Sequence, residues 1–322
     1  MAGLTEIIKE AGIVGCGGAG FPTHAKYSGG PVETIIVNGA ECEPLLQTDR
    51  YLMRNCARKL IRTADRIKEE TGAKEFIIAL KAAYTREIES LERAIEELGS
   101  SVKLHKLQSF FPAGDEQTIV YEVTGRVVPP AAIPLSVGCV VSNVATIYGI
   151  GDAFEGKPFT RKFLTVTGEV AHPTILRVPV GTPVSECIAL AGGTHLSRFI
   201  VVNGGPMMGR AMVNLDSPVT KGCSGITVMS GRDAQRREAT QCIKCAKCVS
   251  ACPMGLEPYY LSKMTQKKGW DELEALMITS CIECGCCQST CPAYLPLLDW
   301  VRLGKQTVMG LIRARAAAAP KK

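Results

Sequence analysis

The run Cys242-Ile243-Lys244-Cys245-Ala246-Lys247-Cys248-Val249-Ser250-Ala251-Cys252-Pro253 decides how the C-terminal part of the chain folds. Its spacing, C-x2-C-x2-C-x3-C-P, occurs again at Cys281-Ile282-Glu283-Cys284-Gly285-Cys286-Cys287-Gln288-Ser289-Thr290-Cys291-Pro292, and 28 residues separate the last cysteine of the first run from the first of the second. Three thiolates separated by two residues can wrap one face of a cubane iron–sulfur cluster. The fourth thiolate, turned away by the proline that follows it, points to a neighbouring cluster.

The repeat therefore predicts two [4Fe–4S] clusters that exchange their fourth ligands, as in bacterial two-cluster ferredoxins. One ligand set is Cys242, Cys245, Cys248 and Cys291, and the other is Cys281, Cys284, Cys287 and Cys252. Zinc sites and disulfides also use closely spaced cysteines, but neither explains why the x3-C-P ending occurs twice. The spacing selects Cys287 rather than its neighbour Cys286, which we expect to be a packed thiol or to lie beside a cluster.

The composition is that of a globular protein long enough for two or three domains. Of the 322 residues, 46% are hydrophobic and 32 are glycine, and the net charge is +6. Seven of the fifteen cysteines fall outside the two ligand sets, and this odd, scattered remainder argues against a secreted disulfide framework. We find no signal peptide, no apolar run long enough to span a bilayer and no basic, aromatic-rich patch for nucleic acid. We therefore expect a cytoplasmic protein, or one held at the cytoplasmic membrane face only through partner subunits.

A glycine-rich stretch follows the first predicted helix, Leu4–Ala11. Five of the nine residues from Gly12 to Gly20 are glycines, which a helix or strand would not tolerate, so we expect a loop whose backbone comes close to a ligand. Exposed peptide N–H groups in such a loop can cradle a phosphate or the edge of a flavin, although glycine loops also form plain turns. Lys26 follows closely and could supply a cation to a phosphate.

Strand and helix signals then alternate, which predicts a parallel sheet with helices on its faces. The predicted strands are Thr34–Val37, Glu75–Leu80, Ser101–Leu107 and Val137–Val141, and the predicted helices are Gln47–Glu70, Thr85–Leu98, a run after Glu116, and Val144–Ala153. The first strand delivers Asn38, Glu41 and Glu43 to its C-terminal end, which is where open α/β sheets bind their ligands.

Polar residues mark two of the helix starts in this part of the chain. Asp115 and Glu116 begin the helical run after a turn, where the helix dipole favours acidic residues. Ser142 and Asn143 are positioned to cap the helix that starts at Val144. From their position alone, the two acids are caps rather than catalytic groups.

The chain becomes rich in β-branched residues after Gly156-Lys157-Pro158, which predicts a small β module. Its expected elements are strands at Arg161–Val170, Ile175–Val180 and Phe199–Val202 and one helix at Pro183–Ala191. A charged linker, Gly231–Thr240, leads into the cysteine region, where we expect short helices at Tyr259–Gln266 and Asp271–Thr279. The basic C-terminal tail, from Arg302 to Lys322, is expected to be a frayed, solvated helix.

Six motifs follow one another along the chain: residues 17–23 (GGAGFPT), 38–44 (NGAECEP), 112–116 (PAGDE), 142–146 (SNVAT), 166–169 (VTGE) and 204–209 (GGPMMG). Together they resemble the RnfC-like family, the C subunit of the Rnf ferredoxin:NAD oxidoreductase. The first four are also similar, more remotely, to the NADH-binding flavoprotein subunit of respiratory complex I. The resemblance covers essentially the whole chain. It implies a Rossmann-like FMN- and NADH-binding α/β domain (1–157), a small β-grasp (SLBB) domain (158–232) and a helical two-[4Fe–4S] ferredoxin-like domain (233–322).

The resemblance also implies which residues bind the cofactor and the nucleotide. Those expected at FMN are Gly17, Gly18, Gly20, Asn38, Glu41, Asn143 and Thr146, of which the last two complete its phosphate site, and Lys26 is expected to contact phosphate. Phe21 is expected to stack on the NADH adenine and Glu43 to lie on the NADH side. Asp115 and Glu116 are expected to bind near the flavin and the nicotinamide ribose. Because hydride transfer requires no acid or base, Glu43 and Glu116 are expected to orient the reactants rather than move protons.

The implied activity is that of an NADH dehydrogenase subunit, in which electrons pass from NADH to FMN and then singly through the two clusters to a partner in a hetero-oligomeric redox complex. Rnf C subunits usually carry an additional N-terminal domain and a long C-terminal tail, and the sequence shows neither. We therefore expect the chain to serve a soluble assembly, for example of the methylenetetrahydrofolate reductase type, rather than a membrane complex. The alternatives are a peripheral subunit of a membrane Rnf complex, a cobalamin-reducing flavoprotein and a non-catalytic electron-wiring subunit. Ala40 replaces an acid of the complex I relatives, and Cys16, beside the glycine loop, is expected to be inert.

Overall fold

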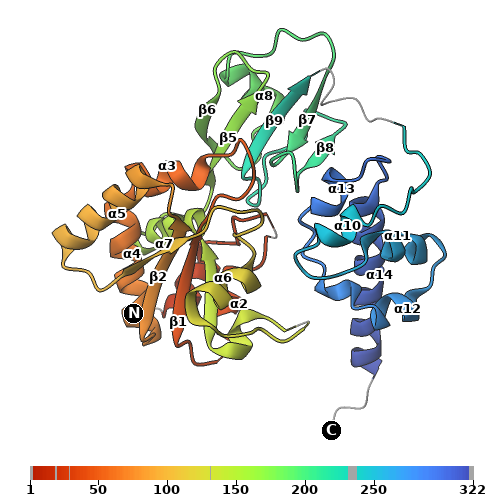
Figure 1. The fold of residues 1–322 in the computed structure, drawn as a ribbon. Helices are drawn as coiled ribbons and strands as arrows, with labels where there is room; N and C mark the ends of the chain where they lie inside the picture. The colour runs from red at the N-terminus through yellow and green to blue at the C-terminus, as the bar shows by residue number, and fades with distance from the viewer. Residues whose placement is uncertain (1–2, 19, 29, 131, 231–237, 319–322) are drawn as a thin grey trace. The chain divides into compact units, whose positions relative to one another are not determined.

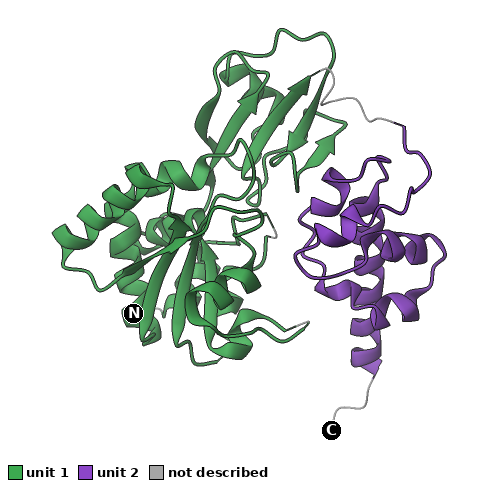
Figure 2. Ribbon diagram, in the orientation of Figure 1, with its two compact units in different colours: residues 1–234 green, residues 235–322 purple. Residues whose placement is uncertain are grey.

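In a computed structural model of the protein, described over residues 3–18, 20–28, 30–130, 132–230 and 238–318, the chain forms two compact units. The units are Met1–Ala234 and Gln235–Lys322 (Figure 2). Most of the predicted charged linker, residues 231–237, lies outside the described residues, and the predicted boundary between 232 and 233 falls within it. Both internal domain boundaries therefore stay predictions.

The first part of unit 1 contains a four-stranded sheet in the order β3-β2-β1-β4 (Figure 1). Its strands are β1 (Thr34–Gly39), β2 (Glu75–Lys81), β3 (Lys103–Leu107) and β4 (Cys139–Asn143). All three strand pairs are parallel, which confirms the predicted α/β architecture. Since the chain steps outward from β1 to β2 and β3 and then returns to the other side of β1, the order reverses between β1 and β4. Open parallel sheets bind ligands at such a switch point.

Successive side chains of β1 point to opposite faces of the sheet and pack into two separate hydrophobic cores. Ile35 and Val37 face the larger core, whereas Ile36 faces a smaller one. The larger core is covered by α1 (Leu4–Glu10), α3 (Thr48–Asn55), α4 (Ala57–Thr71), α5 (Thr85–Leu98) and α7 (Val144–Phe154). Helix α6 (Glu116–Thr124) covers the smaller core, and the short helix α2 (Thr23–Tyr27) follows the glycine loop. The helices thus lie on both faces of the sheet and leave the strand ends for the site.

The predicted single helix Gln47–Glu70 was wrong, because the structure divides it into α3 and α4 at Cys56. Cys56 has φ −124° and ψ 20°, outside the helical range. The preceding Asn55 donates its side-chain amide to the Tyr51 carbonyl at 2.9 Å, which competes with the helical backbone bond at the end of α3.

The second part of unit 1 is a five-stranded sheet in the order β6-β5-β9-β7-β8. Its elements are β5 (Arg161–Gly168), β6 (Thr174–Pro179), α8 (Val184–Leu190), β7 (Phe199–Asn203), β8 (Arg210–Met212) and β9 (Gly225–Ser230). The sequence did not predict β8 or β9. Strand β8 has only three residues, and in β9 Ile226, Thr227 and Val228 are all buried, so that strand lacks the half-exposed pattern of an amphipathic strand.

Unit 2 is helical and is built around the long helix α14 (Leu297–Ala318). The shorter helices are α10 (Lys247–Ser250), α11 (Pro258–Gln266), α12 (Trp270–Ala275) and α13 (Cys286–Ser289). The expectation of a frayed, solvated tail was wrong for the first half of α14, because Val301 and Val308 are buried against Leu261 and Leu273. Lys321 and Lys322 lie outside the described residues. None of the helices in the described ranges has the length and apolarity needed to cross a bilayer.

Gly168, at the end of β5, generates a prediction for the stability of unit 1. Its φ is +85°, and an added Cβ would lie 2.0 Å from the carbonyl oxygen of Val228. Gly168→Ala should therefore lower the free energy of unfolding by roughly 3 kcal/mol, since backbone strain and a steric clash combine. The matched control, Gly181→Ala, has φ +103° with no atom within 4 Å of its added Cβ, and should lose only about 1 kcal/mol. Urea unfolding monitored by circular dichroism measures both, and equal losses would contradict the clash.

Candidate functional site

The C-terminal ends of β1 and β4 bring together several residues that the resemblance assigns to FMN. Asn38 lies in β1 and Glu41 follows it, while Asn143 ends β4 and Thr146 lies in the first turn of α7. The Asn143 side chain caps α7 by accepting a hydrogen bond from the amide of Ala145 at 2.9 Å. An 11-residue helix capped in this way presents its positive end to the switch-point crevice, and such an end suits a phosphate.

The glycine loop lies beside this helix end. The Cys16 amide donates to Thr146 Oγ1 at 3.0 Å, and the Cβ of a residue replacing Gly17 would lie 3.7 Å from Asn143 Cβ. Gly18 and Gly20 have φ values of +107° and +63°, and no protein atom lies within 4 Å of the position a Cβ would take at either. The loop therefore combines left-handed backbone with open space next to a helix N-terminus, and its residues fit the phosphate end of a flavin nucleotide.

Two acidic side chains lie together at the base of the crevice. Glu41 Oε2 accepts the Asp49 amide at 2.6 Å, and Asp49 Oδ2 accepts the Asn143 side-chain amide at 2.6 Å. Burial, followed by repulsion from Asp49, raises the pKa of Glu41 to about 8, and burial raises the pKa of Asp49 to about 6. Glu41 also has a left-handed φ of 37°. A residue with left-handed backbone and two acids with raised pKa values make the end of β1 a candidate functional site.

Other protein groups already contact the predicted site residues Lys26, Asp115 and Glu116. Lys26 Nζ lies 2.7 Å from Glu116 Oε1 and donates to the Val141 carbonyl at 2.8 Å. Asp115 is the N-cap of α6, and accepts the amides of Gln117 and Thr118 at 3.0 and 3.1 Å. The structure thus places Lys26 beside Glu116, and it uses Asp115 as the cap that its position predicted.

The turn before α6 is tied to the end of β1. Asn38 Nδ2 donates to the Gly114 carbonyl at 2.7 Å, and the Gly114 amide donates to Cys42 Sγ at 2.7 Å. A Cβ at Gly114 would lie 2.8 Å from that sulfur, so this close approach requires glycine.

Glu43 and Phe21, both assigned to the NADH side, differ in their surroundings. Glu43 accepts the Met207 amide at 3.1 Å and also the Met208 amide, so its carboxylate holds the turn at residues 204–209 of the β-grasp domain. Gly205 must be glycine here, because its Cβ would lie 2.2 Å from Glu43 Oε2. The Phe21 side chain is 46% exposed, so its ring is accessible for stacking.

Two charged residues of this site, Asp49 and Lys162, were not predicted from the sequence. Asp49 was part of the expected helix Gln47–Glu70, and Lys162 of the expected strand Arg161–Val170. Lys162 is only 1% exposed and lies in phase with the buried Leu164 and Val166 on β5. That alternation was visible in the sequence and could have identified Lys162 as an inward-facing lysine.

The two cysteine runs of unit 2 repeat in conformation as well as in sequence, at an offset of 39 residues. Positive φ values occur at Lys244, Ala246 and Gly255 in the first run and at Glu283, Gly285 and Tyr294 in the second. The amide of Lys244 donates to Cys242 Sγ and that of Glu283 to Cys281 Sγ, both at 3.4 Å. Backbone that bends sharply around thiols and directs amides at their sulfurs fits the surroundings of an iron–sulfur cluster.

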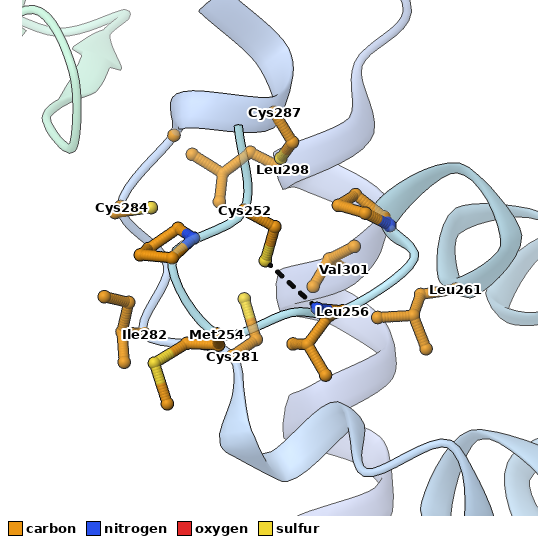
Figure 3. Close-up of a pocket in the computed structure, with 13 residues that line it drawn as sticks. Cys252, Met254, Leu256, Leu261, Cys281, Ile282, Cys284, Cys287, Leu298 and Val301 are labelled. Carbon is orange, nitrogen blue, oxygen red and sulfur yellow. Dashed lines mark hydrogen bonds between the residues drawn. The ribbon is translucent and has the colours of Figure 1, made fainter. Parts of the chain in front are cut away.

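One cavity in unit 2 is lined by four thiols, those of Cys252, Cys281, Cys284 and Cys287 (Figure 3). This is the second predicted ligand set, including the exchanged cysteine from the first run. Apolar side chains complete the wall, among them Met254, Leu256, Ile282, Leu298 and Val301. Cys286 is not among the lining residues, in keeping with its expected role outside the ligand set.

The first predicted set is more open. Cys245 is exposed, and Cys242, Cys248 and Cys291 are half-buried. Burial raises the pKa of Cys248, and the Cys291 thiol of the second run contributes to the rise. In the described part of the chain, no three cysteine, histidine or acidic side chains stand close enough to hold a single metal ion.

Comparison with protein families divides the chain into the three predicted domain types. Residues 8–152 match the model of the Nuo51 FMN-binding domain, residues 163–211 the SLBB domain, and residues 234–292 the 4Fe-4S dicluster domain. These matches confirm the predicted order of the domains.

Two kinds of curated protein are similar to most of the chain. Cobalamin reductase PduS of Citrobacter freundii is 43% identical over 272 residues, which are 80% of this chain and 59% of the relative. The C subunit of the Na(+)-translocating ferredoxin:NAD(+) oxidoreductase complex of Acetobacterium woodii is 35% identical over 277 residues, which are 84% of this chain and 62% of the relative. The chain thus spans about 60% of the length of these relatives. Their similarity confirms the resemblance found in the sequence.

The fold is shared with a solved structure of NAD+-reducing [NiFe]-hydrogenase in the H2-reduced state. The match has a TM-score of 0.67 and 17% identity, and covers 99% of this chain and 66% of the other.

The cysteine cavity predicts unequal roles for two adjacent residues. Cys287→Ser should reduce the iron content of anaerobically reconstituted protein from about eight to about four atoms per chain, because it removes one ligand of one cluster. The matched control Cys286→Ser should keep all the iron. Iron analysis with electron paramagnetic resonance of the reduced protein measures this, and loss of iron from the Cys286 variant alone would contradict the assignment.

The acid pair predicts that the FMN-free protein loses stability as the pH rises. Since the pKa of Glu41 is raised from 4.5 to about 8, the folded protein retains a proton that the unfolded chain has released. Stability from this group is therefore fully present below about pH 4.5 and is lost progressively up to about pH 8. Glu41→Gln should flatten the fall in melting temperature between about pH 5 and 8. An unchanged pH profile would show that Glu41 does not hold this proton.

Proposed function

Because the chain belongs to the RnfC-like family of electron-transfer subunits, we propose that it takes electrons from NADH and passes them through FMN and two [4Fe–4S] clusters to a partner. The observation that carries the proposal is the glycine loop, which opens beside the capped N-terminus of α7 at the β1/β4 switch point. The same chain carries the two cysteine runs. One chain would thus hold both the site where NADH delivers two electrons and the iron–sulfur clusters that carry the electrons away one at a time.

Each cofactor supplies a different part of this chemistry. FMN, when bound, accepts two electrons as a hydride and releases them one at a time, and an iron–sulfur cluster carries one electron. The chain supplies binding and orientation. The peptide N–H groups around Gly18 and Gly20 and the end of α7 would hold the flavin phosphate, while Asn38 holds the neighbouring turn in place.

The nucleotide side depends on Phe21, Lys26, Glu43 and Glu116. Phe21 is accessible for stacking on an adenine, and Lys26 and Glu116 form a polar pair next to it, with Lys26 Nζ 6.0 Å from the centre of the Phe21 ring. Glu43 fixes the turn at 204–209 through two backbone amides. These groups would orient NADH and limit water at the reacting face without donating or accepting a proton.

The acceptor is a separate part of the proposal. An assembly of the methylenetetrahydrofolate reductase type was expected from the sequence, and that expectation stays a prediction. A cobalamin acceptor is a second candidate, favoured by the 43% identity to a cobalamin reductase. A peripheral role in a membrane-bound ferredoxin:NAD oxidoreductase complex is the third, since the C subunit of such a complex is 35% identical. Proteins that co-purify from the native host under anaerobic conditions distinguish the three.

The proposed activity can be tested on purified, anaerobically reconstituted protein. We expect about one FMN per chain and reduction of an artificial dye by NADH. Phe21→Ala should raise the KM for NADH about tenfold with little change in kcat, because stacking on a base is worth roughly 1–3 kcal/mol. The matched control is Tyr121→Ala, which removes another exposed aromatic ring and should leave KM unchanged.

Protein that holds both clusters but no flavin would refute the proposal. It would favour the non-catalytic electron-wiring subunit instead. In that case, partner-to-partner electron transfer would continue without NADH, and Phe21→Ala would have no effect on it.

A further inference from the structure

Lys162 is a charged residue buried in the interior of unit 1. It lies on β5, the first strand of the β-grasp domain, and is 1% exposed. Its neighbour Arg161 is exposed, because successive side chains of a strand point to opposite faces. Lysine is almost never fully buried unless it is paired, so its burial here needs an explanation.

The ammonium group of Lys162 has little direct compensation within the protein. The hydrogen bond that it donates to the carbonyl oxygen of Cys16 is long, at 3.5 Å. No carboxylate among the residues that the structure describes lies within ion-pair distance of it. An ammonium buried in this way costs several kcal/mol relative to water. A site that keeps such a group is prepared for a negative charge.

The position of Lys162 connects it to the glycine loop. Both peptide groups of Cys16 are engaged, since its amide donates to Thr146 Oγ1 at 3.0 Å and its carbonyl faces Lys162 Nζ. The loop is therefore held from one side by the flavin domain and from the other by the β-grasp domain. Its open glycines, Gly18 and Gly20, follow directly.

The acidic residues Glu41 and Asp49 at the crevice are a second reason why an anionic cofactor would need a nearby positive charge. Burial raises the pKa of both Glu41 and Asp49, whereas the field of Lys162 acts in the opposite direction and favours their ionised forms. A flavin nucleotide would add a phosphate next to these acids, of which Asp49, with a pKa of about 6, is ionised at neutral pH. The N-terminus of α7 contributes only about half a positive charge. The full positive charge of the Lys162 ammonium would offset the repulsion between the acids and the phosphate of the flavin nucleotide.

We infer that Lys162 is a positioning residue of the flavin site, supplied by the β-grasp domain. Its ammonium group holds the carbonyl side of the glycine loop and balances the acid pair, so that the loop can receive the negatively charged cofactor. The inference rests on the proposed binding of FMN and extends the site into a second domain. It explains why the strand that begins the β-grasp domain carries a lysine in phase with its core residues.

A purely structural lysine and a positioning lysine predict opposite results for Lys162→Met. If Lys162 serves only to stabilise the fold, the substitution should destabilise the protein and leave FMN affinity unchanged. If it prepares the site for an anion, replacing an underpaired ammonium by an apolar side chain of similar length should leave the melting temperature of the FMN-free protein unchanged or raise it. FMN should then bind at least tenfold more weakly, and the midpoint potential of bound flavin should become more negative.

The experiment uses the full chain reconstituted anaerobically, with Arg161→Met as the matched control on the exposed face of β5. FMN affinity is measured by quenching of flavin fluorescence, potential by redox titration, and stability by thermal melting without FMN. If Lys162→Met does not fold, Lys162→Met/Asp49→Asn removes the opposing charge as well, and is compared with Asp49→Asn. Wild-type affinity and potential in the folded Lys162 variant would overturn the inference while leaving the proposed function intact. Absence of FMN binding by the wild type would instead refute the proposed function.

Discussion

The pairing of β1 with strands on both sides determines where this protein can hold a cofactor. Because β1 lies between β2 and β4 with all strands parallel, the connections leave in opposite directions and a crevice forms at the strand ends. Asn38 and Glu41 reach that crevice from β1, and Asn143 reaches it from β4. The glycine loop, far away in sequence, is brought to the same place by the bond between Cys16 and Thr146. A change in strand order would disperse all of these groups.

The β-grasp domain completes the crevice rather than merely following it in sequence. Thr165 of β5 accepts the Gln47 amide at 3.0 Å and contacts Thr48 Oγ1 at 2.8 Å, next to the acid pair. Lys162 reaches the glycine loop from the same strand, and the turn at 204–209 reaches Glu43. These contacts come from different segments of the domain and end on different parts of the crevice. Both sheets of unit 1 therefore contribute residues to the crevice.

The sequence predicted well what depends on spacing and poorly what depends on burial. The cysteine pattern predicted which four thiols share a cavity, because ligand spacing is a local property of the chain. The parallel sheet followed from alternating strand and helix signals. By contrast, the burial of Asp49 within a helical segment follows only from tertiary packing. The burial of Lys162 was not predicted, although its alternation with Leu164 and Val166 was visible in the sequence. The break at Cys56 likewise depends on a side-chain bond of Asn55 within an otherwise helical pattern.

The two cysteine sets of unit 2 are equivalent in spacing but unequal in surroundings. The set with Cys284 and Cys287 lies in an apolar cavity, and the α14 residue Lys305 donates to the Cys281 carbonyl at 2.6 Å. The other set includes the exposed Cys245. Hydrogen bonding, nearby charge and solvent exposure all set the potential of an iron–sulfur cluster, so clusters at these places would differ in potential despite identical ligands. Of the two, the one at Cys245 would be open to solvent and hence accessible to a partner. The repeat thus provides two similar ligand sets, and α14 makes them different by covering one of them.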